Sequence, residues 1–106
     1  MIIVKSKNKI PLRLTKERWN HIVLRHPEMG GQKEHVLGTA TDPDLIQQGD
    51  FGELIAVKFY EKTPLTSKYL ITIYKEVMDT DGFIITAIIQ QNRPKGGKHY
   101  GGDKDT

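Results

Sequence analysis

The chain has no cysteine, which excludes structural disulfides and metal sites built from thiolates. No apolar run approaches the ~20 residues that a membrane-spanning helix requires. The apolar stretch at residues 2–4 is too short for the core of a secretory signal peptide, and its flanking charges lie on the wrong side. We therefore expect a cytoplasmic protein with no membrane partner.

Several catalytic motifs are absent as well. The four histidines are His21, His26, His35 and His99. They form no HExxH motif or similar pair, which argues against a metal hydrolase. No glycine-rich loop is placed for nucleotide binding, and neither serine lies in a nucleophile elbow. We predict that the protein uses neither a metal nor another cofactor.

The size and composition are those of one globular domain. The 106 residues are 37% hydrophobic and 27% charged, which is typical of a folded chain. Residues 92–106 contain four glycines and no aliphatic side chain. We therefore predict a single domain over residues 1–91 and a flexible, basic, glycine-rich tail over residues 92–106.

The net charge is only +3, but the charges are unevenly distributed. Residues 1–33 carry eight Lys and Arg against two Glu, whereas residues 34–91 carry four Lys against nine acidic residues. A basic N-terminal third fits a surface that binds a polyanion. A solvated surface of mixed charge explains the same distribution without any function.

A first helix is predicted over residues 16–25. Thr15 is a good N-cap, Glu17 lies in the first turn, and Pro27 stops the helix. At about 100° per residue, one face of this helix is apolar and carries Trp19, Ile22 and Val23. The flank beside it is cationic and carries Arg18, His21 and Arg25.

A second helix is predicted over residues 32–41, and the stretch DPDLIQQGD indicates a further helical turn capped by Asp42. The pattern then changes to the period of two that indicates strands, at residues 52–61, 68–77 and 83–91. Short turns between them predict an antiparallel meander. We expect the helices to cover one face of this sheet, and the other face to carry Lys58, Tyr60, Thr72, Tyr74 and Thr86.

Some of these residues suit proton transfer and charge stabilisation on RNA. RNA supplies its own nucleophile, the 2′-hydroxyl, so an enzyme needs only a base, an acid and cationic or hydroxyl donors. Side chains of these types are His21, Arg25, His26, Lys58, Tyr74, Lys75 and Thr86. Each also has a purely structural explanation, since His26, for example, could cap the helix end before Pro27.

Four segments occur in the order LTKERWNHIVLRHPEM, HVLGTATDPDLI, YLITIYKEV and GFIITAII. The chain thereby resembles the barnase–EndoU–colicin–RelE-like (BECR-fold) nucleases of phages and bacteria over roughly residues 13–90. The most specific piece is HIVLRHPE with the downstream DPDLI. The resemblance implies an α+β fold, in which N-terminal helices pack on a four-stranded antiparallel sheet, and a metal-independent activity on RNA.

Carried over residue by residue, the resemblance gives the catalytic candidates His21, Arg25, His26, Lys75 and Thr86. The charge of Arg25 favours a neutral His21, and the helix dipole favours a protonated His26. We therefore predict His21 as the base and His26 as the acid. The predicted RNA contacts are Arg18, Lys58, Tyr60 and Tyr74.

The leading hypothesis is a ribonuclease that cleaves RNA by attack of the 2′-hydroxyl and leaves a cyclic phosphate. The alternative is a catalytically inactive module of the same fold that binds RNA or a protein through the basic helix flank. A third interpretation is a toxin with the same chemistry, for which a protein inhibitor or antitoxin is a further expected partner. Cleavage of RNA in the presence of EDTA would separate the first hypothesis from the second.

Overall fold

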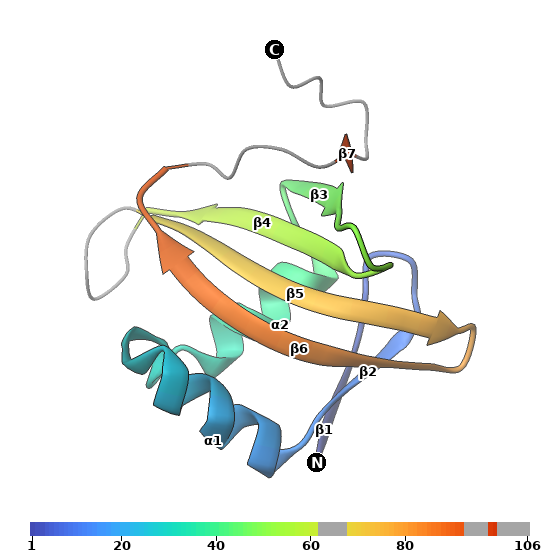
Figure 1. The fold of residues 1–106 in the computed structure, drawn as a ribbon, viewed down its shortest axis with the longest axis horizontal. Coiled ribbons are helices and arrows are strands. Elements are labelled where there is room, and N and C mark those ends of the chain that lie inside the picture. The colour runs from blue at the N-terminus through green and yellow to red at the C-terminus, as the bar shows by residue number, and fades with distance from the viewer. Residues whose placement is uncertain (62–67, 93–97, 100–106) are drawn as a thin grey trace.

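Two helices lie against one face of a β-sheet in the computed structural model of the chain, which describes residues 1–61, 68–92 and 98–99 (Figure 1). In chain order the elements are β1 (Ile2–Lys5), β2 (Pro11–Leu14), α1 (Lys16–Arg25), the 3-10 helix η1 (Pro27–Met29), α2 (Lys33–Thr41), β3 (Leu45–Gln48), β4 (Leu54–Tyr60), β5 (Lys68–Met78), β6 (Asp81–Gln90) and β7 (Lys98–His99). The strand order in the sheet is β1-β2-β6-β5-β4-β3-β7. None of the helices in these residues is long and apolar enough to cross a membrane.

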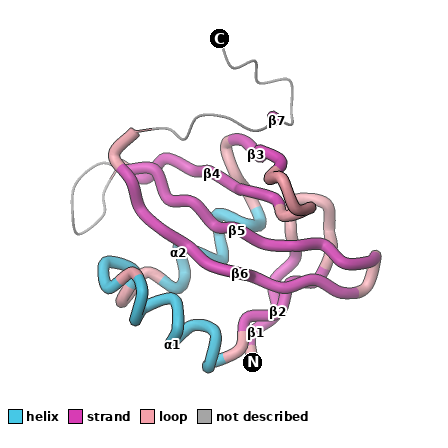
Figure 2. The backbone as a smooth tube through the Cα atoms, viewed as in Figure 1, coloured by secondary structure: helices cyan, strands magenta, loops and turns pink. Residues whose placement is uncertain are grey.

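The centre of the sheet is the antiparallel meander of β4, β5 and β6 (Figure 2), as predicted. Strands β1 and β2 form a hairpin, and β2 runs parallel to β6 at Leu12↔Gly82 and Arg13↔Phe83. The prediction of an α+β fold is therefore confirmed. The sheet differs from the four-stranded antiparallel one that was expected, because the hairpin makes it mixed and β3 extends it beyond β4.

Helix α1 has the predicted bounds, and its ends show why. The Thr15 hydroxyl accepts a hydrogen bond from the Arg18 backbone N–H at 3.0 Å, which caps the first turn. At the other end the His26 N–H donates to the Ile22 carbonyl at 2.7 Å, and Pro27 prevents a further turn. Helix α2 begins one residue after its predicted start and ends at Thr41 as predicted, with Val36 fully buried.

The prediction of a helical turn in DPDLIQQGD is wrong, since these residues lead into β3. Asp44 bonds to β4 through both its main chain and its side chain. Its backbone N–H donates to the Val57 carbonyl at 2.8 Å, and its carboxylate accepts a hydrogen bond from the Phe59 N–H at 2.9 Å. Leu45 then pairs with Val57 in antiparallel register. Pairing with β4 thus overrides the local capping signal of Asp42 and Pro43.

The predicted assignment of the sheet faces is wrong for Lys58, Tyr60, Thr72 and Tyr74, which lie on the helix side, and holds for Thr86, which lies opposite the helices. Thr72 and Tyr74 are fully buried under the helices, and the Thr72 hydroxyl donates to the Val36 carbonyl of α2 at 2.9 Å. The opposite face carries a smaller apolar cluster of Leu45, Val57 and Ile71, flanked by Ile55, Tyr69, Ile73 and Ile88. Because β4 and β5 are apolar on both faces, alternation could not indicate which face the helices cover.

Most of the predicted tail lies outside the described residues, which include none of 93–97 or 100–106. Between these two gaps, β7 pairs with β3 through Gln47↔His99 and Gln48↔Lys98. The division of the chain into residues 1–91 and 92–106 therefore stays a prediction.

Candidate functional site

The basic flank of α1, defined as Arg18, His21 and Arg25, is exposed along its length. In the part of the chain that the structure describes, none of the three side chains makes an ion pair or a hydrogen bond. Other cations are already engaged, as Arg13 is with Asp81. The basic flank is thus available to an external anion.

Two shallow cavities lie beside the basic flank. One, of about 250 Å³, is lined by Thr15, Glu17, Arg18 and His21. The other, of about 180 Å³, is lined by Arg13, Thr15, Arg18, Phe83 and Ile84. Since Arg18 lines both cavities, the Arg18 end of the flank lies close to Arg13 and Phe83, where β2 pairs with β6. Glu17 is the one acidic residue among these lining residues.

His26 stands apart from the first of these cavities, because it is not among the described residues that line it. Its backbone ends α1, and its side chain gives η1 no capping hydrogen bond. The Nδ1 atom lies 3.9 Å from a carboxylate oxygen of Glu28, so the two form an ion pair when the ring is protonated. The structural role expected for His26, ending the helix, therefore belongs to its main chain and leaves the imidazole for other use.

Lys58 and Tyr60 face α2 and hold it to the sheet. The Lys58 ammonium donates to the Asp42 carbonyl at 2.8 Å and lies 3.2 Å from the Asp42 carboxylate, at the C-terminal end of the helix. The Tyr60 hydroxyl donates to the His35 carbonyl at 3.2 Å, and its ring lies 4.5 Å from the His35 ring. Both residues thus have a structural explanation in the packing of α2.

The remaining candidates do not share a surface with the basic flank. Tyr74 lies in the main core with none of its surface exposed. Thr86 pairs with Ile73, so it points to the face opposite the helices. Lys75 follows Tyr74 in β5, so it points away from the core, to the same face as Thr86. There its ammonium lies 3.5 Å from the Phe51 carbonyl oxygen. The structure therefore brings His21 together with Arg18 and Arg25, and not with Lys75 or Thr86.

Arg13, which lines one of the cavities beside the flank, was not predicted as a site residue from the sequence. Its guanidinium donates two hydrogen bonds to Asp81, at 2.8 and 3.1 Å, and lies 5.9 Å from the Phe83 ring centre. The hydrogen bond to Asp81 and the charge of that carboxylate raise the pKa of Arg13. The signal that could have revealed it is the lone cation in the alternating stretch PLRL, opposite the apolar positions Leu12 and Leu14.

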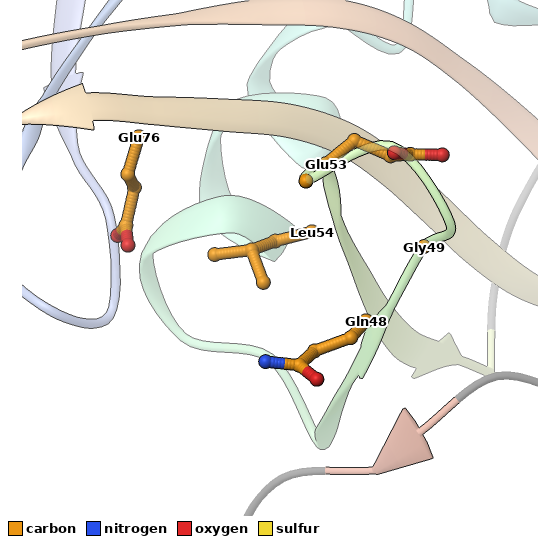
Figure 3. Close-up of a pocket in the computed structure, with 6 residues that line it drawn as sticks. Gln48, Gly49, Glu53, Leu54 and Glu76 are labelled. Carbon is orange, nitrogen blue, oxygen red and sulfur yellow. The ribbon is translucent and has the colours of Figure 1, made fainter.

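A third cavity, of about 310 Å³, is lined by Gln48, Gly49, Gly52, Glu53, Leu54 and Glu76 (Figure 3). The Glu76 carboxylate accepts hydrogen bonds from Ser6 at 2.6 Å and from Asn8 at 3.1 Å. Two carboxylates and no cation make this cavity unsuitable for a phosphate. Among the residues described, no group of three or more His, Asp or Glu is placed to hold a metal ion.

Comparison with protein-family models, with curated proteins and with solved structures found no match for this chain. The roles of the residues therefore rest on the sequence and on the geometry given above.

Proposed function

We propose that this chain is an RNA-binding domain of the BECR ribonuclease type that holds RNA phosphates on the basic flank of α1 and cleaves the strand without a metal. The proposal rests mainly on one observation: three exposed basic side chains, Arg18, His21 and Arg25, lie along one flank of α1. None of the three has an ion-pair partner among the described residues. Guanidinium groups suit phosphate because they donate paired hydrogen bonds. The proposed setting is the cytoplasm, which agrees with a chain that has no cysteine.

The proposed chemistry uses His21 as the base. His21 removes the proton from a 2′-hydroxyl, the 2′-oxygen bonds to the adjacent phosphorus, and the 5′-oxygen leaves with a proton that His26 donates. The products are a 2′,3′-cyclic phosphate and a free 5′-hydroxyl. Arg18 and Arg25 offset the charge that develops on the phosphate. Lys75 and Thr86 take no part in this scheme, because they point to the other face of the sheet.

The second candidate is a catalytically inactive module that binds RNA through the same flank. It is favoured by the position of His26, which does not line the cavity beside His21. An acid that is remote from the base could not serve the same phosphate. In this candidate the contacts of Arg18 and Arg25 with phosphate remain, and no bond is cleaved.

The test is incubation of the purified protein with single-stranded RNA in EDTA, beside a matched strand in which every 2′-hydroxyl is methylated. The proposal expects a cyclic phosphate from the RNA and no product from the methylated strand. His21→Gln and His26→Gln should each abolish cleavage and leave the melting temperature nearly unchanged. His35→Gln is the matched control, because the His35 ring is held by Gln32 and Tyr60 and lines neither cavity beside the flank.

The outcomes separate the candidates. Binding without cleavage, lost on replacing Arg18 and Arg25, would establish the inactive module. Cleavage that survives His21→Gln would exclude His21 as the base. A protein that neither binds nor cleaves RNA would overturn both candidates.

A further inference from the structure

One of the two cavities beside the basic flank combines an apolar surface with polar groups at its edge. It measures about 180 Å³ and lies where β2 pairs with β6 and the chain continues into α1 (Figure 1). Phe83 and Ile84 supply the apolar surface, and Arg13 and Arg18 supply N–H donors. Binding sites for organic ligands have this make-up but usually measure about 300–1,000 Å³. The cavity is therefore of a size for one ring system and not for a whole cofactor.

The two arginines of this cavity differ in how their charge is balanced. The Arg13 guanidinium donates from Nε and Nη2 to Asp81 at 2.8 and 3.1 Å, so a carboxylate offsets its charge. Arg18 has no ion-pair partner among the described residues. A phosphate is therefore favoured at Arg18 and disfavoured beside the Asp81 carboxylate. The part of a ligand that lies at Arg13 should carry no charge.

Arg13 nevertheless keeps donors for an uncharged group. A guanidinium has five N–H groups, and the bonds to Asp81 use two of them. The other three have no acceptor in the part of the chain that the structure describes. The paired bonds to Asp81 also restrain the plane of the guanidinium, and 41% of the Arg13 side chain is exposed. Arg13 thus presents oriented donors to a ligand that has acceptor atoms.

Phe83 adds an aromatic surface beside these donors. It pairs with Arg13 of β2 on one side and with Lys75 of β5 on the other, so the three side chains form a row on the face away from the helices. The Phe83 ring is half-buried and lines the cavity, so part of it is open to a ligand. Nucleobases stack on aromatic side chains of this kind. An aromatic ring between two cations is therefore a suitable surface for a base.

We propose that this cavity binds an unpaired guanine base of the RNA whose phosphate lies on Arg18. This inference rests on the proposed function and names its substrate class. The base packs on the Phe83 ring with its edge toward Arg13, whose free N–H groups donate to O6 and N7 of guanine. Because Arg18 and Phe83 line the same cavity, one nucleotide can occupy both contacts.

The same contacts exclude other nucleic acids. Adenine presents the N6 amino group next to N7, so an Arg13 N–H would meet another donor in place of the guanine O6. A base inside a duplex is stacked on both sides and cannot lie on Phe83. The substrate class is therefore single-stranded RNA, or a loop, that contains guanine.

The test uses the whole chain and a labelled strand of about six abasic nucleotides with one central guanine. The strand contains no 2′-hydroxyl and cannot be cleaved, and its single base cannot be replaced in the cavity by a neighbour. Fluorescence anisotropy should show about tenfold weaker binding for the fully abasic strand, since one stacked base is lost. Adenine or 7-deazaguanine, which lacks the N7 acceptor, should each weaken binding by about fivefold.

Matched variants test the two contacts. Phe83→Leu keeps an apolar side chain but removes the ring, so it should weaken the guanine strand about tenfold. Its affinity for the fully abasic strand should not change, which also shows that the variant is folded. Phe59→Leu is the control on the same sheet face, because Phe59 pairs with Tyr69, about 20 Å along β5 from Lys75. Arg13→Lys keeps the charge but lacks the paired donors and should abolish the preference for guanine over adenine.

Each result decides between the alternatives. If the guanine and abasic strands bind equally and Arg18→Ala weakens both, the inference is wrong and the phosphate contact of the proposed function stands. If neither strand binds, both fail. If the guanine strand binds through Phe83 but natural RNA is not cleaved, the inference holds and only the proposed cleavage fails. A preference for adenine, or an equal loss of affinity in Phe59→Leu, would also overturn the inference.

Discussion

Replacement of Arg18 and Arg25 by alanine should make RNA binding less sensitive to salt by a calculable amount. Each cation that neutralises a phosphate of a single strand contributes about 0.7 to the slope of log affinity against log salt concentration. The two arginines of the basic flank together contribute about 1.4. A fourfold rise in KCl, from about 50 to about 200 mM, should therefore cost the native protein about sevenfold in affinity through these two contacts alone.

The assay is fluorescence anisotropy with a labelled, 2′-O-methylated RNA that cannot be cleaved. Lys58→Ala is the control, because it also removes one positive charge, but the Lys58 ammonium is held by Asp42. The geometry predicts an unchanged slope for this variant, whereas an RNA contact would reduce it by about 0.7. The double arginine variant should unfold at nearly the native temperature, since exposed charges contribute little to stability.

Two results would refute this reasoning. A double variant with the native slope would show that the basic flank does not contact phosphate. A slope that falls in Lys58→Ala and not in the double variant would move the RNA to the end of α2 near Asp42.

Other substitutions test the fold. Gly82→Ala should lower the free energy of unfolding by about 1–3 kcal/mol, because the added Cβ would lie 2.6 Å from the Lys75 carbonyl oxygen. Gly38→Ala, in α2 with only an ordinary contact nearby, should instead raise it by about 0.5–1 kcal/mol, and urea titration measures both. Thr15→Ala removes the cap of α1 and should cost about 1 kcal/mol in the same titration. Thr72→Val removes a buried hydrogen bond to α2 and should cost about 1 kcal/mol, seen as a lower melting temperature.

Local signals were sufficient for α1, whose bounds follow from residues next to it in the chain. Thr15 supplies the cap, and Pro27 supplies the stop. The three central strands could likewise be predicted, because their period of two is long and their turns are short. In each of these elements, the residues that determine where it begins and ends lie within a few positions of its ends.

Features that depend on distant residues could not be predicted in this way. The stretch DPDLI carries a strong helix signal, and only the bonds of Asp44 to Val57 and Phe59 of β4 direct the chain into a strand that begins at Leu45. Lys58 is a residue type that often contacts RNA. Only its hydrogen bond to the Asp42 carbonyl shows that it has a structural role. The basic flank was predictable, because it depends on helical periodicity alone, whereas its separation from Lys75 and Thr86 depends on which face the helices cover.

The parallel pairing of β2 with β6 has a consequence for how the chain folds. The contacts that fasten the N-terminal hairpin join residues far apart in the chain: Ser6 bonds to Glu76 across 70 positions, and Arg13 to Asp81 across 68. During synthesis the hairpin is made first, yet its partner strand is the last of the meander to leave the ribosome. Leu12 and Leu14 therefore stay exposed until β6 has formed, and closing so long a loop is slow. The hairpin is thus made before the strand that β2 pairs with, and until β6 forms, its apolar side chains are open to association with other chains.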